Sequence, residues 1–159
     1  IRRAANIDYL TGLPNRRHFF NRVNANLKMA PESVSLALVD IDHFKAINDN
    51  YGHDVGDLAL KAVADCFGEH FSDHHIARFG GEEFCVYISG LDPQLVLDKV
   101  EQFRKAIEAS PLQVGNDSIS CTVSIGVSSD YSGSIKETIR LADACLYKAK
   151  QNGRNQTVA

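Results

Sequence analysis

Apolar residues recur at helical spacing in several stretches of this chain and at strand spacing in others. Asn15 is a typical helix-capping residue, and the helical stretch that follows it stops at Ala30 and Pro31. A short helix is expected to carry Phe44 and Ile47. Longer helices are expected at residues 55–67, 95–107 and 135–152.

Other stretches favour strands. A dense run of Val, Leu and Ile at residues 33–41 predicts a buried strand, and residues 119–127 alternate after a Gly-Asn turn. Strands at residues 75–79 and 82–89 flank Gly80 and Gly81, a signal for a tight hairpin. Because helices fall between strands, we expect an α/β (α+β) sandwich with a mixed, mostly antiparallel sheet and helices packed on it.

The composition supports one globular domain over residues 1–159. Hydrophobic residues make up 44% and charged residues 23% of the chain, and the net charge of −3 disfavours a nucleic-acid partner. No apolar run reaches the ~18 residues of a membrane span, so no membrane partner is expected in this segment. The only methionine is Met29, so we expect a C-terminal fragment of a longer protein.

The four cysteines bear on location. They are widely spaced, form no CxxC pair and sit in apolar segments, which predicts reduced, buried thiols and a cytoplasmic location. Cys66, His70 and His74 are spaced four residues apart, as zinc ligands on a helix can be. A zinc site is disfavoured because Cys66 lies on the apolar face and no fourth ligand is evident.

Acidic residues end the strand expected at residues 33–41. Counting by twos places Asp40 and Asp42 on one strand face, after three apolar residues. Two such carboxylates repel each other, and a divalent cation with oxygen ligands would relieve the repulsion. The alternative is that both acids cap the following helix.

A second acidic pair, Glu82 and Glu83, follows Gly80 and Gly81. Glycines let a ligand approach the backbone closely, although a surface turn followed by solvated acids explains the same pattern. Both acidic pairs lie at strand ends, where α/β folds commonly bind ligands. Three converging carboxylates would suit metal-assisted phosphoryl transfer.

Basic residues supply candidate phosphate ligands. These are Lys45, the backbone N–H groups of His43 and Phe44 at an expected helix start, and the pair Lys150 and Arg154. Basic residues that complete a helix C-terminus are the alternative for that pair. No GxxxxGK[ST] loop or GxSxG motif is present, which disfavours a P-loop nucleotidase and a serine hydrolase.

Five segments, in order, resemble the GGDEF family of diguanylate cyclases, and the signature stands here in its GGEEF form. The segments are DYLTGLPNRR (residues 8–17), DIDHFKAIND (40–49), YGHDVGD (51–57), RFGGEEF (78–84) and ADACLYKAKQNGRN (142–155). The resemblance implies the palm-like, ferredoxin-related fold of nucleotidyl cyclases and polymerases. It also implies a bacterial signalling enzyme that joins two GTP molecules into cyclic di-GMP with Mg²⁺ or Mn²⁺.

The resemblance also assigns site residues. Asp40, the backbone carbonyl of Ile41, and Glu82 would bind the metal, and Glu83 would be a second-metal ligand or part of the deprotonation machinery. Asp42 matches the motif, but no chemical step is implied for it.

Substrate contacts follow in the same way. Asn48 and Asp57 would read guanine, whose N1–H and N2–H groups a carboxylate can accept. The phosphate ligands implied are Lys45, Lys150, Arg154 and the amides of His43 and Phe44.

The family reaction needs two domains. The 3′-hydroxyl of one GTP attacks the α-phosphate of another, so a homodimer is expected, paired by an upstream sensor domain outside this sequence. One family feature is missing: the RxxD product-binding site would need an Arg and an Asp where Phe71 and His74 stand. A non-catalytic receptor for GTP or cyclic di-GMP is the main alternative, and a cyclase using ATP is disfavoured by Asp57.

Overall fold

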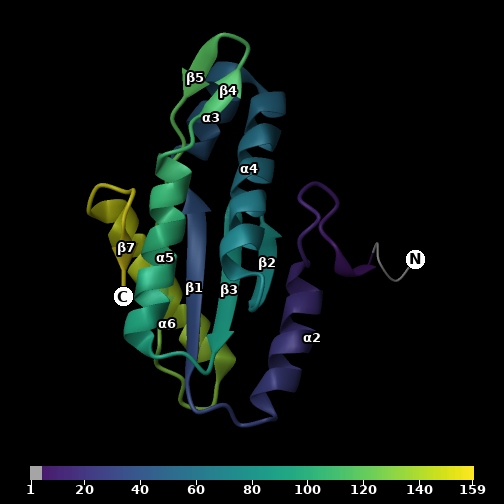
Figure 1. Cartoon of the computed structure of the whole chain (residues 1–159), viewed down its shortest axis with the longest axis vertical. Helices are drawn as coiled ribbons and strands as arrows, with labels where there is room; N and C mark the ends of the chain where they lie inside the picture. The colour runs from purple at the N-terminus through teal and green to yellow at the C-terminus, as the bar shows by residue number, and fades with distance from the viewer. Residues whose placement is uncertain (1–4) are drawn as a thin grey trace.

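A five-stranded sheet runs through the molecule, with helices on both of its faces (Figure 1). The computed structural model describes residues 5–159. The helices are α2 (Arg16–Leu27), α3 (Phe44–Tyr51), α4 (His53–Phe71), α5 (Pro93–Glu108) and α6 (Ile135–Gln151). The strands are β1 (Val34–Ile41), β2 (His75–Gly80), β3 (Glu83–Ser89), β4 (Leu112–Val114), β5 (Asp117–Ile119), β6 (Val123–Ser128) and β7 (Thr157–Val158).

The strand order confirms the mixed, mostly antiparallel sheet. The order is β2-β3-β1-β6-β7, in which β1 is antiparallel to both β3 and β6, and only β7 runs parallel to its neighbour. Helices α3 and α4 connect β1 to β2, and α5 leads from β3 towards β6. This is the split βαβ arrangement of ferredoxin-like folds, with β7 added at one edge.

Strand β1 is buried along its whole length because helices cover both faces of the sheet. Val39 and Ile41 face the core under α4 and α5, whereas Leu36 and Leu38 face the core under α2 and α6. A strand covered on both sides reads as a continuous apolar run, which explains the pattern at residues 33–41.

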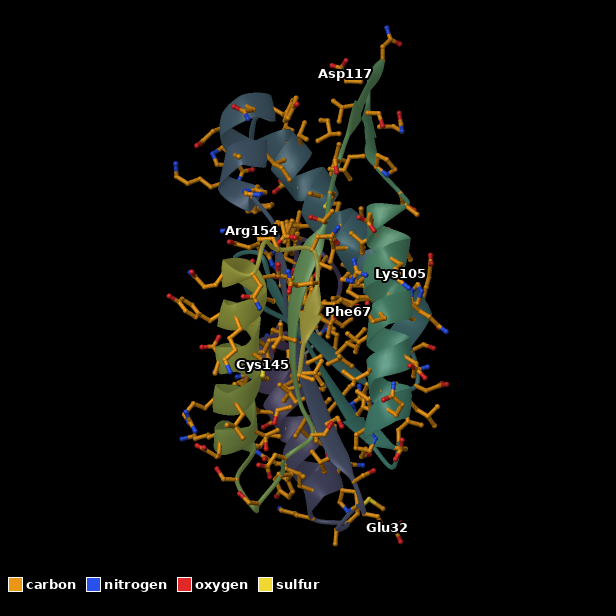
Figure 2. All side chains as sticks on the ribbon, turned by 90° about the vertical axis from the view of Figure 1, so that its left-hand side faces the viewer. Glu32, Phe67, Lys105, Asp117, Cys145 and Arg154 are labelled. Atoms are coloured by element: carbon orange, nitrogen blue, oxygen red, sulfur yellow. The ribbon has the colours of Figure 1, made fainter. Side chains whose placement is uncertain are left out.

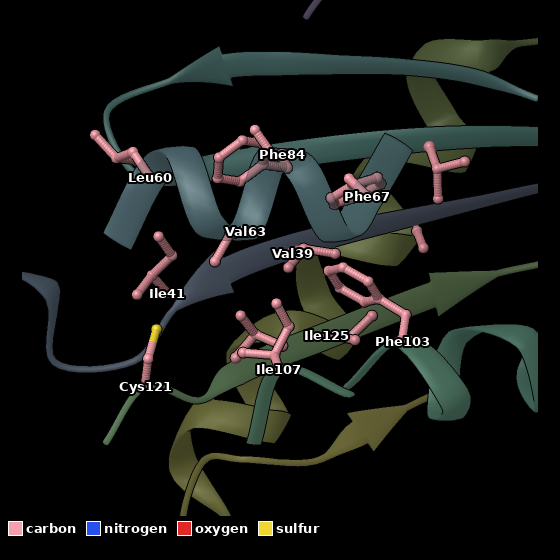
Figure 3. Packing of buried hydrophobic residues seen from close by; sticks show 14 of the residues in the cluster. Val39, Ile41, Leu60, Val63, Phe67, Phe84, Phe103, Ile107, Cys121 and Ile125 are labelled. Carbon is pink, nitrogen blue, oxygen red and sulfur yellow. The ribbon is translucent and has the colours of Figure 1, made fainter. Parts of the chain in front are cut away.

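Aromatic rings fill the core on the α4/α5 side (Figure 3). The ring centroid of Phe67 lies 4.7 Å from that of Phe103 and 5.7 Å from that of Phe84. Phe71 joins the group at 5.3 Å from Phe67 and is 1% exposed. Phe71, the last residue of α4, is therefore part of the core.

Side chains cap three of the helices. Asn15 accepts a hydrogen bond from the backbone N–H of His18 at the start of α2, which confirms the predicted cap. Asp92 and Ser134 do the same for α5 and α6. Helix α3 begins differently, because His43 takes a left-handed backbone conformation and makes no side-chain cap.

The prediction of a single strand at residues 119–127 is wrong. Strand β5 ends at Ile119 and pairs with β4 in a hairpin whose tip, near Asp117, projects from the body (Figure 2). Strand β6 begins only at Val123. Ile119, Cys121 and Val123 still turn into one core, so the alternation continues across a break in the hydrogen-bonded ladder.

The hairpin turn is displaced by one residue from its predicted position. Gly80 pairs with Glu83, so Gly81 and Glu82 form the turn and Glu82 is not on the strand. Gly81 has a φ of 51° at the first loop position, where type II′ turns need glycine. A register shift between Arg78 and Gly80 accounts for the displacement.

The four cysteines are free thiols, as expected. Cys85 and Cys121 are buried, whereas Cys66 and Cys145 are only partly buried, so the expectation of burial is wrong for these two. Within residues 5–159, no helix has the length and apolar character needed to cross a membrane.

Gly126 on β6 leaves no room for a side chain. A Cβ there would lie 2.1 Å from the carbonyl oxygen of Ala142 and 2.2 Å from the backbone nitrogen of Leu146. We therefore expect Gly126→Ala to lower the free energy of unfolding by about 3 kcal/mol, because α6 would have to move off the sheet. Urea denaturation measures the change.

Gly68→Ala is the matched control, because a Cβ at Gly68, within α4, meets nothing within 4 Å. That variant should be up to about 1 kcal/mol more stable than the parent. Equal stability of the two variants would contradict the close packing of α6 on β6.

Candidate active site

A cleft of about 420 Å³ opens at the C-terminal end of β1. It brings together residues from the end of β1, the start of α3, the β2–β3 turn and the end of α6. The residues that line it are Asp40, Ile41, Asp42, His43, Phe44, Lys45, Ala46, Asp49, Glu82, Lys150 and Arg154.

Asp40 and Asp42 are the most deeply buried acids of the cleft. Only one of the two carboxylate oxygens of Asp40 has a hydrogen-bond partner. One of its oxygens, Oδ2, accepts a hydrogen bond from Lys150 Nζ, whereas Oδ1 is buried without a partner. Burial raises the pKa of Asp40, and the charges of Glu82 and Asp42 add to the rise, which outweighs the opposing effect of Lys150. A buried carboxylate oxygen without a donor fits a bound cation.

The two hairpin acids lie differently around Asp40. Glu82 lines the cleft from the turn, and its backbone carbonyl accepts a hydrogen bond from the N–H of Ile41 at 3.3 Å. Glu83 is the direct cross-strand partner of Asp40, so both side chains project from the same sheet face. Burial raises the pKa of Glu83, and the negative charges of Asp40 and Asp143 add to this effect.

The donors present suit a metal that needs few protein ligands. Among residues 5–159, no three His, Cys, Asp or Glu side chains form a ready-made metal cluster. Asp40, Glu82 and the backbone carbonyl of Ile41 nevertheless offer hard oxygen atoms among the residues that line the cleft. Magnesium is commonly bound in this way, by one or two carboxylates with substrate phosphates completing its shell.

Basic groups also line the cleft. His43 and Phe44 start α3, and no side chain caps its N-terminus, which leaves its first-turn amides to a ligand. Lys45 makes only an exposed ion pair with Asp49, at 3.0 Å, so its ammonium group can be recruited at little cost. Lys150 and Arg154 reach the cleft from the end of α6 (Figure 2 labels Arg154).

The predicted base-reading residues lie at the junction of α3 and α4, outside the lining of this cleft. Asn48 Oδ1 is buried without a hydrogen-bond partner. It packs on Gly56, where a Cβ would lie 1.8 Å from it, so only glycine fits there. Asp57 follows on α4 and is exposed.

One supporting contact was not predicted from the sequence. Arg78 donates hydrogen bonds to the carbonyl oxygen of Gly81, at 3.1 and 2.6 Å, and pairs with Asp8 at 3.2 Å. Burial acts to raise the pKa of Asp8, but hydrogen bonds from Thr11 and the nearby Arg78 lower it overall. The N-terminal loop is thereby tied to the turn that carries Glu82, and the only sequence signal was that Asp8 and Arg78 each belong to a recognised motif.

The possible zinc ligands form no site. His70 Nδ1 lies 2.9 Å from the backbone carbonyl oxygen of Cys66 and 3.5 Å from its thiol. Burial raises the pKa of Cys66 to about 11, which disfavours the thiolate that a metal needs. Residues 5–159 hold no cluster of metal ligands around this pair.

Comparison with known proteins shows the family of the chain. The family model described as "Diguanylate cyclase, GGDEF domain" matches residues 5–156. The chain is 35% identical to the probable diguanylate cyclase DgcF of Escherichia coli and 39% identical to a diguanylate cyclase of Vibrio cholerae, over 96% of its own length in each case.

Similarity extends to solved structures. The GGDEF domain of DgcB from Caulobacter crescentus, solved in complex with c-di-GMP, superposes with a TM-score of 0.93 and is 34% identical. That comparison covers 100% of this chain and 98% of the other. The chain spans about half the length of the two curated relatives, 51% of the first and 49% of the second. By the match over nearly all of its residues, the chain belongs to the GGDEF-domain family of diguanylate cyclases.

Proposed function

We propose that this domain is a diguanylate cyclase that condenses two GTP molecules into cyclic di-GMP and releases two pyrophosphates. The observation that carries the proposal is the cleft at the end of β1, where a buried carboxylate with an unpartnered oxygen lies among basic residues. Acidic and basic groups that line the same cleft suit a polyphosphate with its metal.

The metal would be Mg²⁺ or Mn²⁺. Asp40, the carbonyl of Ile41, and Glu82 would hold it, and Glu83, beside Asp40, would be a further ligand or help to deprotonate the attacking hydroxyl. When bound, such an ion activates the nucleophile and neutralises phosphate charge. The unpartnered oxygen of Asp40 and the oxygen-only donor set support this assignment.

The remaining residues would bind and orient GTP. Lys45, Lys150 and Arg154, with the amides of His43 and Phe44, would hold the phosphates in the cleft. The glycines Gly80 and Gly81 have positive φ values and allow the turn that places Glu82 in the cleft.

Guanine would be read at the α3–α4 junction. Asn48 Oδ1, which lacks a partner, and the exposed carboxylate of Asp57 would accept hydrogen bonds from the N–H groups of the base. Adenine would present an acceptor to the same carboxylate, and such a mismatch discriminates strongly.

A homodimer would complete the reaction. The cleft at the end of β1 would hold one GTP, while the product contains two guanylyl units. Two domains related by a two-fold axis would each present a 3′-hydroxyl to the α-phosphate held by the other. Upstream sequence, such as a sensor domain, would bring the domains together.

The first test is turnover and its dependence on the metal ligands. GTP with Mg²⁺ should yield cyclic di-GMP and pyrophosphate, and Glu82→Ala or Asp40→Ala should remove this activity while leaving the fold intact. Loss of a metal ligand costs several kcal/mol of transition-state stabilisation, a rate loss of roughly a thousandfold or more. Product chromatography measures the rate.

Glu32→Ala is the matched control, because this exposed acid lies at the opposite end of the molecule (Figure 2) and should leave the rate unchanged. Near-normal cyclization by a folded Glu82→Ala protein would contradict the metal assignment. GTP binding without turnover by the parent would favour the alternative function, a non-catalytic nucleotide receptor.

A second test is protein concentration. Because each domain would supply half of a two-GTP site, the rate per enzyme molecule should rise steeply with concentration for this domain alone. Initial rates across a wide dilution series, with light scattering to record the oligomeric state, measure this. A flat specific activity without a stable dimer would disprove the two-domain reaction.

A third test concerns product inhibition. Phe71, which stands where the RxxD site needs an arginine, is buried in the aromatic core, and His74 stands in place of the acid. We expect cyclic di-GMP to bind at least ~10-fold more weakly than to an intact site, because charged hydrogen bonds worth about 1.5–3 kcal/mol each are lost.

Rates with added product at several GTP concentrations, together with calorimetry, test this. Inhibition that GTP overcomes would reflect product in the active site. Strong inhibition that GTP cannot overcome, and that Asp73→Ala abolishes, would contradict the prediction.

A further inference from the structure

Asp42 differs from Asp40 in having both carboxylate oxygens occupied. Its Oδ2 accepts hydrogen bonds from Thr122 Oγ1 at 2.8 Å and from the backbone N–H of Asn155 at 3.0 Å. Its Oδ1 accepts from Ser124 Oγ at 2.6 Å. The residue is 6% exposed, so protein donors rather than water satisfy its carboxylate. Asp42 is therefore already bonded within the protein.

The segment that Asp42 contacts has an unusual backbone. Gly153, Arg154 and Asn155 have φ values of 113°, 65° and 46°, so two non-glycine residues in succession are left-handed. Such conformations are strained and persist where surrounding contacts hold them. Within the turn, the N–H of Arg154 donates to the carbonyl of Ala149 at 3.0 Å.

Helix α5 holds the same turn from the other side. Arg104 Nη1 donates to Asn155 Oδ1 at 2.9 Å, and Asn155 Nδ2 donates to Glu108. Arg104 is itself held by Glu101 at 2.8 Å, and its side chain is 12% exposed. Asn155 is thus clamped between α5 and Asp42, next to the residue that projects into the cleft.

We propose that Asp42 is a positioning residue that fixes the left-handed turn and so directs Arg154 onto the phosphates of the bound nucleotide. The inference rests on the proposed function, since it assigns a task within the same cleft. Asp42 lines the cleft, but protein donors occupy both of its carboxylate oxygens, so it acts through Arg154. Replacing Asp42 should therefore weaken nucleotide binding by no more than replacing Arg154 does.

The hydrogen-bond pattern predicts which substitutions are tolerated. In Asp42→Asn, the amide oxygen can serve Thr122 and the N–H of Asn155, while the amide nitrogen donates to Ser124, whose hydroxyl can rotate to accept. In Asp42→Ala, the N–H of Asn155 has no acceptor and the turn is released. Asp42→Asn should therefore retain most of the parent's affinity.

The test is a double-mutant cycle on the binding of 3′-deoxy-GTP, which lacks the attacking hydroxyl and cannot be cyclized. Calorimetry with Mg²⁺ should show about tenfold weaker binding for Asp42→Ala and for Arg154→Ala. The double variant should bind within about twofold of Arg154→Ala alone, because both changes remove the same contact. Losses that multiply would overturn the proposal, as would an Asp42→Asn protein as weak as Asp42→Ala.

Arg104→Ala provides a second route, should Asp42→Ala fold poorly. It releases Asn155 from the α5 side and should also weaken binding without adding to the effect of Arg154→Ala. Additive losses from Arg104→Ala would contradict the positioning role. A parent protein that neither binds 3′-deoxy-GTP nor forms cyclic di-GMP would overturn the proposed function and this inference together, whereas a functional parent with an additive cycle would overturn the inference alone.

Discussion

The burial of strand β1 on both faces is the constraint on which the site depends. Helices on each side of the sheet exclude water along β1. Asp40 lies near the end of this strand and is therefore buried as well. Desolvation there raises the pKa of the carboxyl group, so an ionised Asp40 needs a cation beside it. Lys150 supplies one, and the free oxygen leaves room for another. The packing that stabilises the sheet therefore also buries Asp40, whose negative charge must be balanced by cations in the cleft.

The two aspartates at the end of β1 show how neighbouring carboxylates acquire different tasks. Asp40 projects from the strand and has one carboxylate oxygen without a hydrogen-bond partner. Asp42 lies beyond the end of β1, and both of its oxygens accept hydrogen bonds. The donors come from β6, from the segment that precedes β6, and from the turn after α6. Although the two residues are similarly buried, Asp40 is a candidate metal ligand, whereas Asp42 holds neighbouring segments of the backbone in place. The number of protein donors around each side chain decides between them.

Contacts between segments far apart in the chain hold the cleft together. Arg78 bonds to Asp8, which lies 70 residues before it in the chain, and Asp42 bonds to Asn155, which lies 113 residues after it. The site therefore draws on nearly the whole domain, and its residues depend on the completed sheet. Arg78 bonds to both the loop at Asp8 and the turn that carries Glu82.

Local patterns in the sequence determined the helices, the cap at Asn15, the hairpin and the buried strand, because spacing and turn chemistry depend on near neighbours. The motifs also indicated the acids and bases of the cleft. Tertiary structure alone decided that the ladder breaks before Val123, that Glu82 sits in the turn, that Asn48 lacks a partner and that Asp42 braces the Arg154 turn. Each of these outcomes depends on which hydrogen-bond donors distant segments bring, or fail to bring, to a given atom, and that information is absent from local spacing.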